Sequence, residues 1–254
     1  MMLLKINNIS KSFDGLIALN NLSLEVKENS LTALIGPNGC GKSTLFNIIS
    51  AVLPADENSG SIIFDGTDIL GKKTYDIAKI GLSRTYQDTR LFKDLTVIEN
   101  LMLPPKKQIG ERILNALFKT RFKKQEEELK SKALEILDLL DITHMAYEYA
   151  KNLSGGQSKL VDIGRVLMSS PKMLLLDEPT AGVNPALTEK LFQKIVDLKN
   201  NLGLTILLIE HDMDVIMRAE VDHVYVANQG EIITHGSPEA VKQNKDVIEA
   251  YLGK

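Results

Sequence analysis

The chain has 254 residues, of which 44% are hydrophobic and 25% charged, which is ordinary for a globular protein of one or two domains. Its formal net charge of −3 argues against a dedicated nucleic-acid binder, which usually carries a basic face. A single cysteine excludes an internal disulfide and suits a reducing compartment. No apolar stretch reaches the roughly 18 residues of a membrane span. Met1–Lys5 is too short for a secretory signal, so we expect membrane association only through a partner.

The N-terminal third of the chain is predicted to be rich in strands. Leu22–Val26 alternates apolar and polar residues, which is the period of a half-buried strand. Asp14-Gly15 marks a turn before it. Ser61–Phe64 indicates a further strand, and Asp65-Gly66 indicates the turn that ends it.

An eight-residue loop, Gly36–Ser43, fits the pattern G-x-x-x-x-G-K-[ST]. The apolar run 31–35 before it predicts a short buried strand. A helix is expected from Thr44, with one apolar face made of Leu45, Ile48, Ile49 and Val52. Strand, glycine-rich loop and helix form the arrangement that cradles a nucleoside triphosphate. The alternative is a glycine-rich turn that fits the pattern by chance.

The middle of the chain, from about Gln87 to Asn152, is more charged than the rest. Glutamates and lysines in 119–132 stand at the spacing that supports a helix, and they are expected mainly to solubilise it. The apolar stripe of this helix comprises Leu129, Ala133, Ile136, Leu137 and Leu140. We therefore predict a helical subdomain inserted into an α/β body.

The remainder of the chain alternates strands and helices. Met173–Leu176 is apolar throughout, as expected for a strand covered on both faces. Asn184 and Pro185 provide an N-cap and a first-turn proline for the next helix. Leu204–Ile209 predicts a second buried strand. A hairpin is expected from two short apolar runs, 224–226 and 231–234.

Polar groups follow the predicted strands, at the sheet edge where open α/β folds place their ligands. Asp177 could hold hydrated Mg²⁺, and Glu178 could polarise an attacking water. Glu210 and His211 follow the strand 204–209, and His211 could hydrogen-bond a phosphate or serve only a structural role. Without the phosphate loop, Asp177 and Glu178 would be taken as ordinary loop residues.

A second glycine-containing helix start is found at Leu153–Gln157. Ser154 and Gln157 form the S-x-x-Q pattern of a capping box. The two glycines between them, Gly155 and Gly156, cost conformational entropy and leave amides bare for an anion. A second anion-binding helix start is unusual for a simple ATPase.

Three motifs in this order resemble those of ABC-transporter ATPases: Gly36–Ser43, Leu153–Gln157 and Leu174–Pro179. Further segments resemble the ATPase subunit of branched-chain amino acid importers, namely Gly81–Gln87, Arg90–Phe92, Leu95–Leu101, Ala181–Pro185, Glu210–Met213 and Val247–Gly253. The resemblance implies an α/β fold: a P-loop NTPase core with a mostly parallel sheet, an N-terminal antiparallel β subdomain and an inserted α-helical subdomain. Residues 1–254 would form a single ABC ATPase domain, with 1–87 and 153–254 as core and 88–152 as helical subdomain.

The resemblance also implies roles for individual residues, with ATP and Mg²⁺ bound. Glu178 would be the catalytic base and His211 the switch histidine, assisted by Gln87 and Lys42. Phe13 would stack on adenine, although it could equally be a core phenylalanine. The nucleotide-binding set would be Phe13, Asn38, Gly39, Cys40, Gly41, Lys42, Ser43, Thr44, Ser154, Gly155 and Gly156. The Mg²⁺ set would be Ser43, Gln87 and Asp177.

The implied partners are a second ABC ATPase subunit, identical or related, and transmembrane permease subunits. Each ATP would lie between the phosphate loop of one subunit and Ser154, Gly155 and Gly156 of the other. The chain would sit on the cytoplasmic face of the membrane, held there by the permease, and would bind no nucleic acid.

The motifs leave rival functions open. Importers of urea or short amides share much of the pattern. A soluble ABC ATPase of repair or translation would carry the same three motifs, and so would a regulatory module that binds ATP without useful hydrolysis.

Overall fold

The computed structural model describes residues 1–104, 119–211, 213, 216 and 220–252. Two residues of the motifs quoted above, Asp212 and Gly253, lie outside this set. The chain divides into two compact units. The first unit comprises 1–87, 172–181 and 189–254, and the second comprises 88–171 and 182–188.

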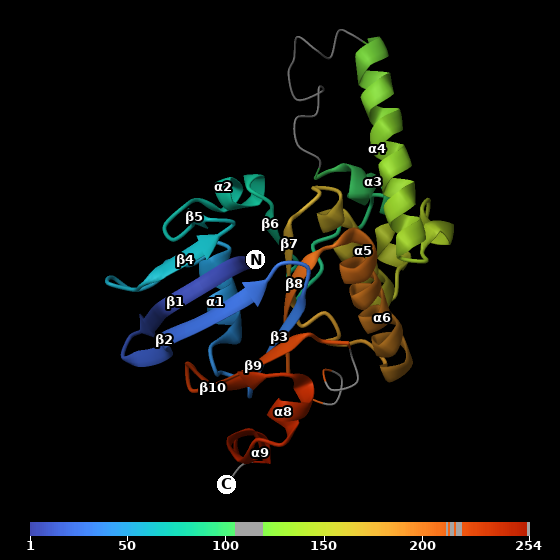
Figure 1. Ribbon diagram of the computed structural model, residues 1–254. Coiled ribbons are helices and arrows are strands. Elements are labelled where there is room, and N and C mark those ends of the chain that lie inside the picture. The colour runs from blue at the N-terminus through green and yellow to red at the C-terminus, as the bar shows by residue number, and fades with distance from the viewer. Residues whose placement is uncertain (105–118, 212, 214–215, 217–219, 253–254) are drawn as a thin grey trace. The chain divides into compact units, whose positions relative to one another are not determined.

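The first unit contains a six-stranded sheet in the order β10-β9-β3-β8-β7-β6 (Figure 1). Its strands are β3 (Leu31–Ile35), β6 (Leu82–Arg84), β7 (Met173–Asp177), β8 (Thr205–Glu210), β9 (His223–Asn228) and β10 (Glu231–Gly236). All neighbouring pairs are parallel except β9 and β10, which form the predicted antiparallel hairpin. Every residue of β3, β7 and β8 is buried, which explains their unbroken apolar runs.

A second, antiparallel sheet of the first unit has the order β2-β1-β4-β5. Its strands are β1 (Met2–Phe13), β2 (Leu16–Lys27), β4 (Ser61–Phe64) and β5 (Thr67–Asp68). Side chains from both sheets and from helix α1 (Lys42–Ile49), such as Leu24, Phe46 and Leu175, share one hydrophobic core. The predicted α/β class with an antiparallel N-terminal sheet is confirmed.

Helix α1 differs from the prediction at both ends. It begins at Lys42, two residues earlier than expected, and ends at Ile49. The Ser50 hydroxyl turns back and donates to the Phe46 carbonyl at 2.7 Å, and Ala51 then takes a left-handed φ of 53°. The prediction that Val52 belongs to the apolar helix face is therefore wrong, and its side chain is 53% exposed.

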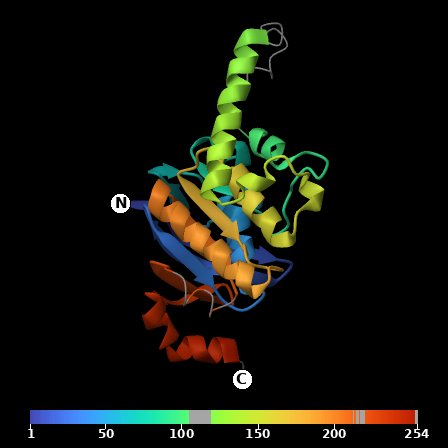
Figure 2. The same cartoon turned by 90° about the vertical axis from the view of Figure 1, so that its right-hand side faces the viewer.

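The second unit is built from helices α3 (Val97–Met102), α4 (Lys119–Leu139) and α5 (Gly155–Leu167). Helix α4 packs against both others and extends past their ends (Figures 1 and 2). The apolar stripe is largely as predicted, because Ala133, Ile136, Leu137 and Leu140 are buried.

The second unit extends beyond the expected helical subdomain, 88–152, because it continues to residue 171 and adds 182–188. Gly164 gives a physical reason for the inclusion of α5. A Cβ on this glycine would stand 3.1 Å from Leu140 Cδ1 and 3.4 Å from Ile136 Cγ2, so its lack of a side chain lets α5 approach α4.

The remaining helices are short, apart from α6, and connect or follow the strands. They are α2 (Thr74–Lys79), the 3₁₀ turns η2 (Thr143–Met145) and η3 (Ala150–Asn152), α6 (Pro185–Leu202), α8 (Pro238–Lys242) and α9 (Lys245–Leu252). Asn184 caps α6 as predicted, since its Oδ1 accepts the Leu187 N–H at 3.0 Å. Among the described helices, none combines the length and apolar character that crossing a membrane requires.

Candidate nucleotide site

The phosphate loop Gly36–Ser43 joins β3 to α1 and needs glycine at two points of close approach. A Cβ on Gly36 would lie 2.1 Å from the Ala227 carbonyl oxygen. A Cβ on Gly41, whose φ is 102°, would lie 2.4 Å from the Ala18 carbonyl oxygen. Gly39 has a φ of 81°, and a Cβ there would meet nothing within 4 Å. The inner glycines therefore let the loop pack, while the exposed tip at Asn38 and Gly39 faces open space.

The first turn of α1 is left without a side-chain cap. Its N-cap residue is Gly41, which supplies no side-chain hydrogen bond, and no acidic residue lies in the first turn. The Ser43 side chain is exposed and Thr44 is partly buried. Uncapped N–H groups and the positive end of the helix dipole together favour an anion at this position.

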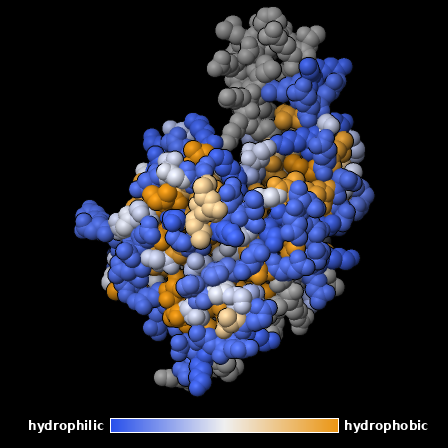
Figure 3. All heavy atoms as spheres, in the orientation of Figure 1, coloured by the Kyte–Doolittle hydropathy of each residue, from blue (hydrophilic) through white to orange (hydrophobic). Residues whose placement is uncertain are grey.

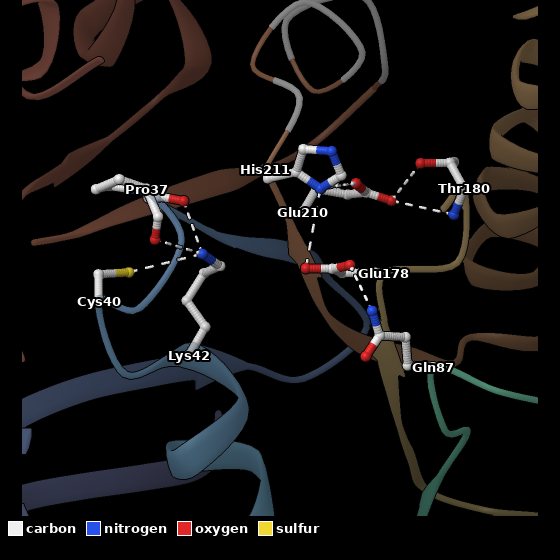
Figure 4. Close-up of polar contacts among 9 residues, drawn as sticks. Pro37, Cys40, Lys42, Gln87, Glu178, Thr180, Glu210 and His211 are labelled. Atoms are coloured by element: carbon white, nitrogen blue, oxygen red, sulfur yellow. Dashed lines mark hydrogen bonds and ion pairs between the residues drawn. The ribbon is translucent and has the colours of Figure 1, made fainter. Parts of the chain in front are cut away.

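Lys42 is buried, and its ammonium is held by the loop itself (Figure 4). Nζ donates to the Gly36 carbonyl at 2.7 Å and to the Pro37 carbonyl at 3.0 Å, and it lies 3.6 Å from Cys40 Sγ. No carboxylate of the described residues pairs with it. A buried cation without a carboxylate partner strongly favours the arrival of an anion. Cys40 is buried and fills space beneath the loop.

Asp177, the last residue of β7, forms a buried ion pair that the sequence did not predict. Arg84, the last residue of β6, donates from Nη2 to Asp177 Oδ2 at 2.6 Å. Its Nη1 donates to Asn47 Oδ1 at 2.8 Å and to Ser50 Oγ at 3.0 Å. Arg84 thus ties the carboxylate to α1 and supplies a permanent cation beside it. The pairing of β6 with β7 brings this arginine beside Asp177, and no local pattern in the sequence shows that pairing.

Three of the residues predicted to act in catalysis lie together at the carboxyl ends of the strands (Figure 4). Gln87 Nε2 donates to Glu178 Oε2 at 3.2 Å, and His211 Nδ1 lies 3.9 Å from Glu178 Oε1. Glu178 has a left-handed φ of 44°, which is strained for a residue with a side chain. Its N–H nevertheless bonds the Ile209 carbonyl at 3.1 Å, so the neighbouring strand β8 holds this conformation in place.

Glu210 differs from the expectation that it follows its strand as a polar loop residue. It is the last residue of β8 and its side chain is 0% exposed. Oε1 accepts hydrogen bonds from the Thr180 N–H at 3.2 Å and from Thr180 Oγ1 at 2.6 Å. Burial raises the pKa of this carboxyl, against the lowering effect of the Thr180 hydrogen bonds. Sequence reasoning missed both Thr180 and the burial of Glu210.

Phe13 ends β1 with its side chain 41% exposed, so it is not a core phenylalanine. Lys11 Nζ lies 5.4 Å from the ring centroid. An exposed aromatic face is what stacking on a planar base requires.

The second glycine-containing helix start belongs to α5 in the second unit. Ser154 Oγ accepts the Gln157 N–H at 3.4 Å, and Gln157 Oε1 accepts the Ser154 N–H at 2.8 Å. The predicted capping box is confirmed. Gly156 has a packing reason, since a Cβ there would lie 2.1 Å from Leu187 Cδ2. Gly155 is open, with the Gly182 carbonyl oxygen nearest at 3.8 Å.

The loop, the uncapped helix and the polar groups at the strand ends define a P-loop nucleotide-binding protein. A family model described as "ABC transporter" matches residues 19–181, and one described as "Branched-chain amino acid ATP-binding cassette transporter" matches 231–254. The chain belongs to the ABC transporter family of ATP-binding subunits, which hydrolyse ATP to power transport.

Individual relatives cover all or most of the chain. A probable branched-chain amino acid transport ATP-binding protein LivG of Archaeoglobus fulgidus is 42% identical, covering 100% of this chain and 96% of the relative. The ADP conformation of MJ1267, an ATP-binding cassette, is 40% identical with a TM-score of 0.84, covering 100% of both chains. A dimeric post-hydrolysis state of the cassette MJ0796, bound to ADP and Pi, is 27% identical with a TM-score of 0.74, covering 92% of this chain and 97% of that one.

Proposed function

We propose that this chain is the ATP-hydrolysing subunit of an importer for branched-chain amino acids. The observation that carries the proposal is the agreement of two matches: residues 231–254 match the branched-chain family model, and the full chain aligns with LivG. The permease and its solute-binding partner select the solute, and this chain supplies the energy.

In this proposal the phosphate loop receives the phosphates of ATP. The exposed amides near Gly39 and the uncapped start of α1 donate to phosphate oxygens, and Ser43 and Thr44 lie at that start. Lys42 exchanges its two loop carbonyls for phosphate oxygens, which carry the opposite charge. Phe13 offers its exposed ring to adenine.

The residues proposed to hold Mg²⁺ offer the hard oxygen donors that this ion prefers. They are the exposed Ser43 hydroxyl, the Gln87 amide oxygen and Asp177, whose Oδ2 is already oriented by Arg84. When bound, Mg²⁺ neutralises charge that develops on the phosphates. The Asp177 carboxylate would act mainly through water, because it is buried and Arg84 occupies one of its oxygens.

Glu178 is proposed to orient the attacking water and accept its proton. Gln87 lies against one carboxylate oxygen of Glu178 and His211 lies near the other. The Gln87 hydrogen bond therefore fixes the direction of the carboxylate, and His211 is half exposed and able to turn toward a phosphate.

Two subunits are proposed to enclose each ATP, with Ser154, Gly155 and Gly156 of one facing the phosphate loop of the other. The dimeric state of the related cassette MJ0796 supports this arrangement. The second subunit is a copy of this chain or a close sibling.

The pair docks on a permease at the cytoplasmic face of the membrane. The surface in Figure 3 is largely hydrophilic with separate hydrophobic patches, and exposed apolar residues of the second unit include Phe92 and Leu103.

The catalytic part is tested with Glu178→Gln. We expect ATP binding to persist and turnover to fall about 100-fold to 10,000-fold, because the amide cannot accept the proton. Dimers should then accumulate with MgATP in size-exclusion chromatography. Glu57→Gln is the matched control at an exposed position, and it should hydrolyse ATP normally. Normal turnover by Glu178→Gln would remove Glu178 from the catalytic role.

The transport part is tested by reconstituting the chain with its permease and binding protein in vesicles. Leucine, isoleucine or valine should stimulate ATP hydrolysis and enter the vesicles. Stimulation by urea or short amides alone would assign the importer to the other solute class. Failure to associate with any permease would favour a soluble ATPase.

A further inference from the structure

Glu210 stands apart from the other buried charged groups of the described residues. Asp162 and Asp177 each have an arginine nitrogen at 2.6 Å, and the Lys42 ammonium has two carbonyls. The Glu210 carboxyl is more deeply buried than any of them and has no lysine or arginine partner among the described residues. Its oxygen Oε2 is buried and makes no hydrogen bond within that part of the chain. An unsatisfied buried oxygen is costly, so its retention calls for an explanation.

The position of Glu210 connects it to three segments of the proposed site. Its Cα pairs with Ile35, the residue directly before the phosphate loop. Its Oε1 holds the backbone N–H and the hydroxyl of Thr180, which is two residues beyond Glu178. His211 follows it in the chain (Figure 4). Glu210 therefore adjoins the loop through its backbone pairing, holds the segment after Glu178 through its side chain, and directly precedes the histidine.

The unsatisfied oxygen faces His211. Glu210 Oε2 lies 3.9 Å from His211 Nδ1, the same distance as Glu178 Oε1. The imidazole thus stands between two carboxyl groups, one fixed in the interior and one proposed as the catalytic base. A small rotation of the half-exposed ring would bring Nδ1 into hydrogen-bond range of Glu210.

A hydrogen bond between Glu210 and Nδ1 couples the protonation of the carboxyl group to the position of the hydrogen on the ring. A protonated Glu210 donates to a bare Nδ1, and an ionised Glu210 accepts from Nδ1–H of an imidazolium. In these two states Nε2 carries a hydrogen, which is what donation to a phosphate oxygen requires, whereas an ionised Glu210 that accepted from Nδ1–H of a neutral ring would leave Nε2 bare. A histidine that paired with Glu178 instead would withdraw that carboxylate from water.

We propose that Glu210 is a positioning residue: it anchors the segment after Glu178 through Thr180 and holds His211 with Nε2–H directed outward and away from the base. This inference rests on the proposed function, because it assigns a support to the same site. Glu210 itself does not contact nucleotide.

The test compares Glu210→Gln with Glu210→Met in the full chain. Glutamine can accept from Thr180 and donate to Nδ1, so it should retain most of the turnover. Methionine fills the space without either bond, and turnover should fall about 100-fold with ATP affinity unchanged. Thr180→Val, which removes only the hydroxyl, should fall between them. It also keeps the test decisive if the methionine variant folds poorly.

A second readout follows His211 directly by ¹⁵N NMR of its ring. The Nε2–H form should dominate in the parent chain and in Glu210→Gln, and a tautomer mixture should appear in Glu210→Met. His211→Ala assigns the signal among the four histidines. Unchanged turnover or an unchanged tautomer in Glu210→Met would overturn the proposal, as would equal loss in both variants. If the parent chain itself did not hydrolyse ATP, the proposed function would fail instead.

Discussion

Helices α1 and α5 both begin beside glycines, but α1 has no side-chain cap and α5 has a capping box. Helix α1 has Gly41 as its N-cap residue and no side-chain cap, and the neighbouring Lys42 ammonium has two carbonyls and the Cys40 sulfur as its partners. Helix α5 has Ser154 as its N-cap residue, and a capping box with Gln157 closes the turn. The first start is chemically incomplete until an anion arrives. The capping box of the second satisfies the N–H groups of Ser154 and Gln157 and leaves those of Gly155 and Gly156 for a ligand, which fits a surface proposed to meet a nucleotide already held by another subunit.

The largest effect is expected from Gly41→Ala, which breaks the first helix start. The new Cβ would meet the Ala18 carbonyl oxygen at 2.4 Å, and the φ of 102° is unfavourable for alanine. We expect loss of measurable nucleotide binding and a free energy of unfolding lower by at least about 2 kcal/mol. Fluorescent-nucleotide titration and urea unfolding measure the two effects.

The control for backbone strain alone is Gly66→Ala, in the turn between β4 and β5. Its φ is 73°, and a Cβ there would meet nothing within 4 Å. It should cost about 1 kcal/mol of stability and leave nucleotide binding intact. Equal binding losses in the two variants would mean that general destabilisation, and not the shape of the loop, explains the effect.

A smaller and more selective effect is expected from Gly156→Ala, at the second helix start. Its Cβ would lie 2.1 Å from Leu187 Cδ2, a side-chain end that can shift, so the cost is about 1–3 kcal/mol. ATP should still bind to the single subunit, but hydrolysis should fall because the surface proposed to face the partner is displaced. Steady-state turnover at saturating ATP separates this result from a binding defect.

Gly155→Ala sharpens the same comparison, because the nearest atom to its new Cβ is 3.8 Å away. Stability should not fall, and any loss of hydrolysis then reports a methyl group placed where the partner's nucleotide is proposed to approach. Full hydrolysis by Gly155→Ala would contradict an anion contact at this helix start.

The two helix starts also show which features the sequence could reveal. The phosphate-loop pattern, the capping box and the continuous apolar strands are local signals, and the structure has each of them at the expected residues. The packing reason for Gly156 is different, because Leu187 lies far along the chain. Sequence spacing could suggest the glycine but could not identify the atom that requires it.

Long-range pairing accounts for the other omissions in the site. Arg84 meets Asp177 only because β6 and β7 are neighbours, and Glu210 meets Thr180 only because β8 lies beside β7. The prediction for Val52 failed for a local reason. The Ser50 hydroxyl ends the helix before the last residue of the periodic apolar pattern is reached. Periodicity identifies the face of a helix but does not fix its last residue.

Ser154→Ala is expected to have a modest effect on stability, about 1 kcal/mol, because the helix loses its cap. Nucleotide binding by a single subunit should be unchanged, and ATP-driven dimerisation should weaken. Ser237→Ala is a matched control, because Ser237 caps α8 by accepting the Ala240 N–H at 3.3 Å. It should cost similar stability and leave turnover unchanged. Analytical ultracentrifugation with MgATP would distinguish the variants. Equal dimerisation of Ser154→Ala and Ser237→Ala would mean that Ser154 serves only as a helix cap.

The smallest effect concerns the pH dependence of stability, because helix α5 carries a buried carboxyl group, Asp162. Burial raises the pKa of Asp162 above its ordinary 3.8, outweighing the nearby Arg165 at 2.6 Å. The folded state then holds the proton more tightly than the unfolded state. The protonated Asp162 therefore stabilises the folded state fully at pH values below 3.8, and this stabilisation is lost as the pH rises through the pKa of the folded state.

Asp162→Asn removes this titration, so its free energy of unfolding should depend less steeply on pH in that window. The difference in slope should be at most about 1.4 kcal/mol per pH unit, which corresponds to one proton. Urea unfolding from about pH 4 upward measures it, with Asp138→Asn on the exposed face of α4 as the control. Identical slopes for Asp162→Asn and the parent chain would mean that Arg165 fully offsets the effect of burial on the pKa of Asp162. Helix α5 would then carry an ordinary ion pair.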